Sequence, residues 1–184
     1  MAPSVSVTRH FQQKGYASAN MMEIAAEVGV SRGPLYYYFS NKADLFRAVI
    51  HRSIEQQKTT YSQILTEEKP FLQMIEEDYL FCSEDKGFFF LMDPIRETEP
   101  ELLQEWQEFS QWLIDLKYRA FSAAKARGEL SSSCDISEVI TFIYIYYYGV
   151  QQTKELSREL KGFSTRMLDH SVDTFLDIIR ERFL

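Results

Sequence analysis

The stretch from Gly29 to Phe46, GVSRGPLYYYFSNKADLF, constrains the fold more than any other part of the chain. It follows MMEIAAEV, whose apolar residues repeat with helical spacing. Gly29 stands where a left-handed residue would end that helix. Ser31 is the predicted cap of the next helix, and Pro34 falls in its first turn, where backbone N–H groups have no partner within the helix. These signals predict two short helices joined by a glycine-containing turn, which is the helix-turn-helix arrangement.

The second helix of such a pair enters the major groove with its N-terminal residues at the base edges. Small residues at its start would let the backbone approach DNA, and Arg32 can reach guanine or phosphate. Tyr36 and Tyr37 would offer hydroxyl donors to phosphates, while Tyr38 could instead pack against the rest of the chain. Lys42 would present its charge, and the start of the next helix, to a phosphate. The alternative is a capped helix whose aromatic surface packs on a neighbour.

Glycine and proline are scarce along the chain, at seven and five residues. They fall mostly between segments of helical period, which predicts an all-α protein of about nine helices. We expect a helix-turn-helix domain over residues 1–52 and a C-terminal ligand-binding and dimerisation domain over residues 53–184. The boundary would lie in or just after the fourth helix. We expect a cytoplasmic protein, because no apolar run reaches membrane-spanning length and the N-terminus lacks a signal-peptide pattern.

The net charge of −7 argues at first against a nucleic-acid partner. Residues 1–52 nevertheless carry six basic and three acidic residues, a net charge of +3, which leaves −10 for the rest of the chain. Only the N-terminal part therefore has the charge expected of a segment that meets a polyanion.

The segment Phe11–Val49 resembles the DNA-binding domain of the TetR/AcrR family of bacterial transcriptional regulators. It contains the Lys-Gly-Tyr turn, an E-I-A-x-x-x-G-V-S helix and turn, a G-x-L-Y-x-x-F recognition helix and a K-x-x-L-F fourth helix. The resemblance implies a homodimer that represses promoters on double-stranded operator DNA until a small-molecule effector enters the C-terminal domain. By position, the implied DNA contacts are Asn20, Ser31, Arg32, Gly33, Pro34, Tyr36, Tyr37 and Lys42.

The first helix departs from the family pattern. MAPSVSVT precedes Arg9, and several of these residues are poor helix formers. We expect its first turn to be missing or frayed, either natively or because the start is truncated.

The C-terminal part is rich in aromatic residues, most of which we expect in an ordinary core. Some would line a pocket for a hydrophobic or aromatic effector, with Phe89, Met92, Trp112, Tyr144 and Tyr147 as the candidate wall. Asp78, Asp93 or Asp115 could balance a cationic ligand, although each is more simply a solvated side chain.

A dimer interface is predicted near the C-terminus. SEVITFIYIYYYGV is apolar on nearly every side, so it would be buried against two partners. The segment 165–183 reads as one helix, and the two helices would pair with those of a second copy. The predicted interface stripe is Leu168, Val172, Phe175, Leu176 and Ile179.

Catalytic patterns are absent from the sequence, so we expect no enzyme, cofactor or metal site. His10, His51 and His170 stand apart from any metal-binding or nucleophile motif, and Cys82 and Cys134 are predicted to be reduced thiols. The remaining alternative is a helical protein-interaction module whose N-terminal domain has lost DNA binding.

Overall fold

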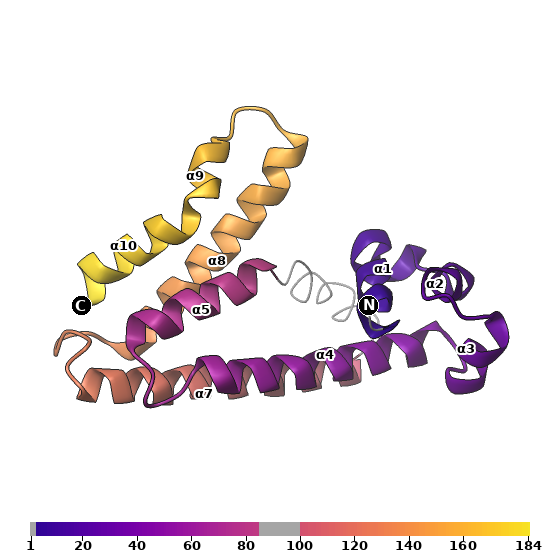
Figure 1. Cartoon of the computed structure of the whole chain (residues 1–184), viewed down its shortest axis with the longest axis horizontal. Coiled ribbons are helices and arrows are strands. Elements are labelled where there is room, and N and C mark those ends of the chain that lie inside the picture. The colour runs from indigo at the N-terminus through magenta and orange to yellow at the C-terminus, as the bar shows by residue number, and fades with distance from the viewer. Residues whose placement is uncertain (1–2, 85–99) are drawn as a thin grey trace. The chain divides into compact units, whose positions relative to one another are not determined.

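In the computed structural model, residues 3–84 and 100–184 are described, and every regular element within them is an α-helix (Figure 1). The all-α prediction is confirmed, with nine helices in these residues. None of them is long and apolar enough to cross a membrane. The helices are α1 Pro3–Ser18, α2 Met21–Glu27, α3 Arg32–Tyr38, α4 Lys42–Ile64, α5 Phe71–Glu84, α7 Pro100–Ala126, α8 Ile136–Glu159, α9 Thr165–Asp169 and α10 Ser171–Phe183.

Helix α1 corrects one expectation and confirms another. It begins at Pro3, so the first turn, which we expected to be missing or frayed, is not missing. Proline at the first turn costs no hydrogen bond, because the N–H it lacks would have had no partner. The Lys-Gly-Tyr turn noted in the sequence is present: Gly15 has φ 72° and ψ 158°, outside the helical region.

The N-terminal unit is a small core under α1, α2 and α3, in which α1 packs on α2 and α2 on α3. Phe11, Ile24 and Phe46 are fully buried in it. The rings of Phe11 and Phe46 meet edge to face, with centroids 5.0 Å apart, and Tyr16 lies 4.7 Å from Phe46. This aromatic packing fixes α1 against the start of α4.

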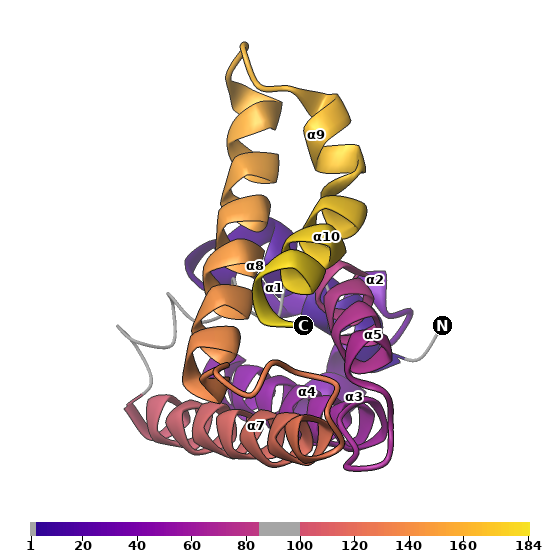
Figure 2. The ribbon, with the colours of Figure 1, turned by 90° about the vertical axis from the view of Figure 1, so that its left-hand side faces the viewer.

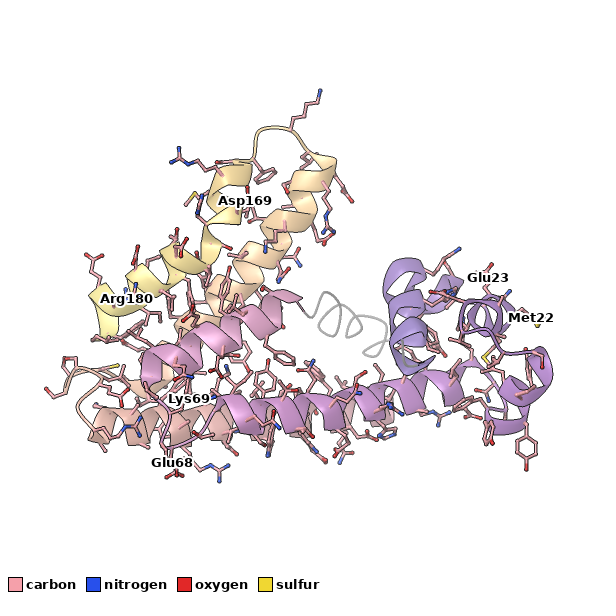
Figure 3. The ribbon with its side chains drawn as sticks, in the orientation of Figure 1. Met22, Glu23, Glu68, Lys69, Asp169 and Arg180 are labelled. Atoms are coloured by element: carbon pink, nitrogen blue, oxygen red, sulfur yellow. The ribbon has the colours of Figure 1, made fainter. Side chains whose placement is uncertain are left out.

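The C-terminal unit is built on α5, α8 and α10, which contact one another in all three pairs. Figure 2 shows α8 and α10 running side by side, with α9 at the upper end of the pair. Lys69 closes the loop between α4 and α5, because its Nζ donates to the Gln63 carbonyl at 2.7 Å and to Glu77 Oε2 at 2.6 Å (Figure 3). A buried aromatic contact between Phe71 and Phe121 ties α5 to α7.

The segment 165–183, predicted as one helix, is two helices. His170, with φ −100° and ψ 22°, separates the short α9 from α10. Within α10 the apolar stripe faces the core of its own chain: Phe175 and Ile179 are completely buried.

Candidate functional site

The turn between α2 and α3 has the geometry of a glycine-terminated helix. Gly29 is left-handed, at φ 73°. Its N–H donates to the Ala26 carbonyl at 3.2 Å, and the Val30 N–H donates to the Ala25 carbonyl at 3.0 Å. This pair of bonds is the Schellman pattern, which satisfies carbonyls at the end of α2 and turns the chain sharply. The left-handed backbone at residue 29 therefore favours glycine, as the sequence indicated.

Helix α3 presents small and phenolic residues to solvent. Ser31 occupies the N-cap position with an extended backbone, but its side chain makes no capping hydrogen bond. Gly33 and Pro34 are exposed, and Leu35 is the buried anchor. Ser31 is therefore the N-cap residue of α3, as the sequence predicts, and its hydroxyl makes no capping hydrogen bond.

The three tyrosines of α3 all reach solvent. Tyr36 is 41% exposed, Tyr37 83% and Tyr38 75%. The rings of Tyr37 and Tyr38 meet edge to face, with centroids 5.1 Å apart. Tyr38 is thus an exposed residue of α3, which resolves its ambiguous position in the sequence.

Asn20 and Lys42 have structural partners in addition to the DNA role predicted for them. Asn20 Oδ1 accepts the Met22 N–H at 2.8 Å and caps α2, which leaves its amide N–H groups as donors. Lys42 Nζ donates to the Tyr16 carbonyl at 2.7 Å and the Ala17 carbonyl at 3.0 Å, near the end of α1. It also lies 4.7 Å from the Tyr16 ring centroid. An ammonium has three donors, so one remains for a phosphate.

An interaction that sequence reasoning missed joins α1 to α2. His10 is buried, and its Nδ1 lies 2.7 Å from Glu27 Oε2. Glu23, labelled on α2 in Figure 3, lies 3.7 Å from His10 Nε2 and 3.6 Å from Lys14 Nζ. Two of the three acidic residues in the N-terminal part are therefore paired with basic side chains of α1, which reduces their repulsion of a phosphate backbone.

The C-terminal unit contains a buried polar cluster, formed by Tyr61, Asp78, Cys82, Lys117 and Tyr147. Lys117 and Asp78 form an ion pair inside the core, with side-chain exposures of 2% and 0%. Burial is the main cause that raises the pKa of the Cys82 thiol and of the Tyr61 phenol, with the nearby Asp78 charge adding to it. Both groups are therefore neutral donors at pH 7.

The predicted ligand residues are only partly brought together. The Tyr147 hydroxyl is buried, and after burial itself the nearby Asp78 charge raises the pKa of Tyr147, as it does that of Tyr144. Trp112 lies on α7 and is half-buried. Phe89, Met92 and Asp93 fall outside the described residues.

Neither of the two described acidic candidates is placed as a counter-charge for a cationic ligand. Asp78 is already neutralised by Lys117, so it is not a free counter-charge. Asp115 is exposed and accepts from Gln111 at 2.9 Å, as a solvated residue of α7 would.

The predicted dimer stripe is largely committed to the fold of its own chain. Phe175, Leu176 and Ile179 are buried within the single chain, on a helix that contacts α5 and α8, so little of their surface is left for a second copy. Leu168 and Val172 are half-buried. The stripe pattern alone could not distinguish an internal core from an interface, since both demand the same periodicity.

Comparison with known proteins agrees with this geometry. Residues 8–49 match the profile of "Bacterial regulatory proteins, tetR family". The chain is 30% identical over 103 residues to the HTH-type transcriptional activator FasR of Mycolicibacterium smegmatis, covering 53% of this chain and 47% of that one. It is 26% identical over 133 residues to the HTH-type transcriptional repressor BepR of Brucella suis, covering 66% and 64%. The chain thus spans about half to two thirds of the length of these relatives.

A solved structure shares the fold. The transcriptional regulator FadR of Bacillus subtilis, determined in complex with stearoyl-CoA, has a TM-score of 0.64 and 16% identity, over 96% of this chain and 95% of that one.

Proposed function

We propose that the chain, whose residues 8–49 match the tetR family of bacterial regulatory proteins, is a transcriptional repressor of that family. It binds double-stranded operator DNA through α2 and α3. It leaves the operator when a small hydrophobic or aromatic molecule binds its C-terminal part. The observation that carries the proposal is the pairing of a sharp Schellman turn with a short helix that exposes Gly33, Pro34 and its tyrosines.

The exposed side of α3 suits a groove lined by phosphates. At its start, Gly33 and Pro34 add little bulk, so the backbone can approach base edges closely. Tyr36 and Tyr37 extend from the same helix, and their phenols can donate to phosphate oxygens. Such contacts set the position of the helix on the duplex, while Arg32 is the residue suited to reading a guanine.

The test begins with selection of binding sequences from a random duplex library, followed by fluorescence anisotropy. We expect Arg32→Ala to weaken DNA binding by about 1–3 kcal/mol and to relax the base preference at one position of the operator. Tyr36→Phe should weaken binding by about 1 kcal/mol through loss of one hydroxyl contact. The matched control is Tyr118→Phe, which removes a phenol from the exposed face of α7 and should change nothing. Failure to select any duplex would support an interaction module instead.

The dimer that reads both halves of an operator needs an interface other than the buried stripe of α10. Exposed apolar residues on α8 and in and before α9 supply one candidate surface. Ile145 is 66% exposed and Met167 68%. We refer to the following set as the α8–α9 face: Ile145, Tyr148, Leu156, Leu160, Phe163 and Met167, all of them large apolar residues exposed in the single chain. A large apolar surface that is exposed in a single chain commonly marks a protein–protein interface. In a two-fold dimer this surface would pack against the same surface of the second copy.

The effector part of the proposal is supported by the aromatic and polar interior of the C-terminal unit. Tyr79, Phe175 and Tyr147 lie in mutual ring contact, close to a buried polar cluster. FadR, which has the same fold, was solved with an acyl ligand. Sites of this kind, apolar with a few polar groups, are typical of small-molecule pockets in helical proteins.

A further inference from the structure

The buried polar cluster of the C-terminal unit is electrically neutral as it stands. Asp78 on α5 and Lys117 on α7 neutralise each other. Asp78 Oδ1 also lies 3.7 Å from Cys82 Sγ, which in turn lies 3.1 Å from the Tyr61 hydroxyl. Lys117 Nζ lies 5.7 Å from the Tyr61 ring centroid. Both charges therefore have partners within the protein.

One group in the cluster is not satisfied. The hydroxyl oxygen of Tyr147, on α8, is buried and has no hydrogen-bond partner among the described residues. Two neighbouring tyrosines contrast with it: the Tyr79 hydroxyl donates to Ser171 Oγ at 2.6 Å, and the Tyr146 hydroxyl donates to the Ser171 carbonyl at 2.8 Å. A buried hydroxyl without a partner costs free energy that a bound acceptor would recover.

The Tyr147 hydroxyl is placed to serve a ligand. Its ring packs against Tyr79 and Phe175, with centroids 5.2 and 5.7 Å away, so the phenol belongs to an aromatic cluster. Burial raises the pKa of Tyr147, and the Asp78 charge raises it further, so the group keeps its proton and remains a donor. An aromatic molecule with one acceptor atom matches both features.

We propose that the effector of this chain is a neutral aromatic molecule whose single polar group, an alcohol or carbonyl oxygen, accepts a hydrogen bond from Tyr147. This inference rests on the proposed function, in which the C-terminal part binds an effector. A charged ligand is disfavoured because its pairing with Asp78 or Lys117 would leave the other charge buried and unpaired. Tyr147 thus favours ligands with a hydrogen-bond acceptor, and the Asp78–Lys117 pair disfavours charged analogues of such a ligand.

Three probes of equal size test the charge requirement: 2-naphthalenemethanol, 2-naphthoate and (2-naphthyl)methylammonium. Binding to the full chain is measured by titration calorimetry at pH 7. We expect the alcohol to bind at least tenfold more tightly than either ion. Tighter binding of an ion, or no binding by any of the three, overturns the proposal.

Tyr147→Phe tests the hydrogen bond. The variant should bind 2-naphthalenemethanol about five- to tenfold more weakly, as expected for loss of one hydrogen bond, and 2-methylnaphthalene as tightly as the natural chain. Tyr146→Phe is the control on the same helix, since its hydroxyl is already bonded to Ser171, and it should leave the alcohol affinity unchanged. Equal affinity of Tyr147→Phe and the natural chain for the alcohol overturns the proposal.

Asp78→Asn should reverse the preference between the neutral and the anionic probe. It leaves Lys117 with an uncompensated charge, so naphthoate should now bind more tightly than the alcohol if the variant folds. Persistent preference for the alcohol would contradict the role given to the ion pair. Operator binding separates this inference from the proposed function: if the alcohol binds through Tyr147 but leaves operator affinity unchanged, the ligand chemistry holds and effector release fails.

Discussion

At the scale of single residues, Lys42 combines a structural role with a proposed DNA contact. Two of its three N–H donors hold the carbonyls of Tyr16 and Ala17, and its charge lies over the Tyr16 ring. The same side chain therefore fixes the end of α1 to the start of α4 and carries positive charge at the N-terminus of α4. A phosphate bound there would meet an ammonium already held in position.

We expect Lys42→Met to lower the free energy of unfolding by about 1 kcal/mol, because carbonyls near the end of α1 lose their donor. Duplex affinity should fall as well, and the slope of log affinity against log salt should decrease by about 1 per bound subunit. Urea unfolding and anisotropy between 50 and 300 mM salt measure the two effects.

Lys58→Met is the control for Lys42. It removes the same charge from the same helix, where Lys58 pairs with Glu55 one turn away, 3.1 Å from Nζ to Oε1. Neither stability nor salt slope should change appreciably, since such exposed pairs contribute little. A loss of stability in Lys42→Met without any change of salt slope would restrict Lys42 to its structural role.

At the scale of elements, α5 depends on a cap supplied by a residue far along the chain. The Phe71 N–H, at the first residue of α5, donates to Glu129 Oε2 at 2.6 Å. Glu129 Oε1 accepts from Arg127 Nε at 2.6 Å, and Arg127 also donates to carbonyls of the α4–α5 loop. The hydrogen bond from Phe71 is the main cause that lowers the pKa of Glu129, with Arg127 adding to it.

We expect Glu129→Ala to lower the free energy of unfolding by about 1 kcal/mol at pH 7, the usual cost of a lost helix cap. Because the folded pKa of Glu129 lies below its ordinary value of 4.5, its stabilisation is complete above pH 4.5 and is lost as pH falls through the folded pKa. The difference in free energy of unfolding between the natural chain and the variant should therefore become smaller as the pH is lowered from 7 to 3.5. Glu155→Ala, in an exposed pair with Arg158, should show no such difference.

The α8–α9 face gives an element-scale prediction for assembly. We expect Ile145→Glu to remain folded but to sediment as a monomer, because it places a charge on an exposed part of the proposed interface. Tyr118→Glu, on an exposed apolar residue of α7, should remain dimeric. Leu176→Glu should instead unfold the chain, since Leu176 is buried in it. A dimeric Ile145→Glu would show that this face lies outside the interface.

Local signals in the sequence predicted the helix-turn-helix, because the devices that form it lie within a few residues of one another. Gly29 ends α2 and Pro34 sits in the first turn of α3 for reasons of backbone geometry alone. The break at His170 carried no glycine or proline, so periodicity merged α9 with α10. Similarly, the first helix forms despite residues of low propensity, since propensity is a weak prior.

Contacts between distant residues could not be predicted. His10 meets Glu27, Lys42 meets the end of α1, and Asp78 meets Lys117 across 39 positions. No single-sequence pattern specifies which lysine pairs with which aspartate. The sequence therefore predicted that α8 supplies tyrosines to a ligand site. It predicted neither the neutral ion pair nor the unpartnered Tyr147 hydroxyl. The functional boundary near residue 52 and the DNA contacts themselves stay predictions.

At the scale of the whole molecule, regulation requires the ligand and DNA sites to influence each other. Helix α4 carries Lys42 at its start and Tyr61, a member of the buried polar cluster, in its last turn. A ligand that shifts the cluster can thus act on the N-terminal unit through one continuous helix. By thermodynamic linkage, if the ligand lowers operator affinity by a given factor, the operator lowers ligand affinity by the same factor.

The most direct test of ligand-controlled DNA binding is the affinity of a stabilising ligand, 2-naphthalenemethanol in the first instance, measured with and without saturating operator duplex. We expect the operator to weaken ligand binding by about 5- to 150-fold, which corresponds to a coupling of about 1–3 kcal/mol. Equal affinity in both conditions, for this and every other ligand that stabilises the chain, would contradict a repressor released by its effector.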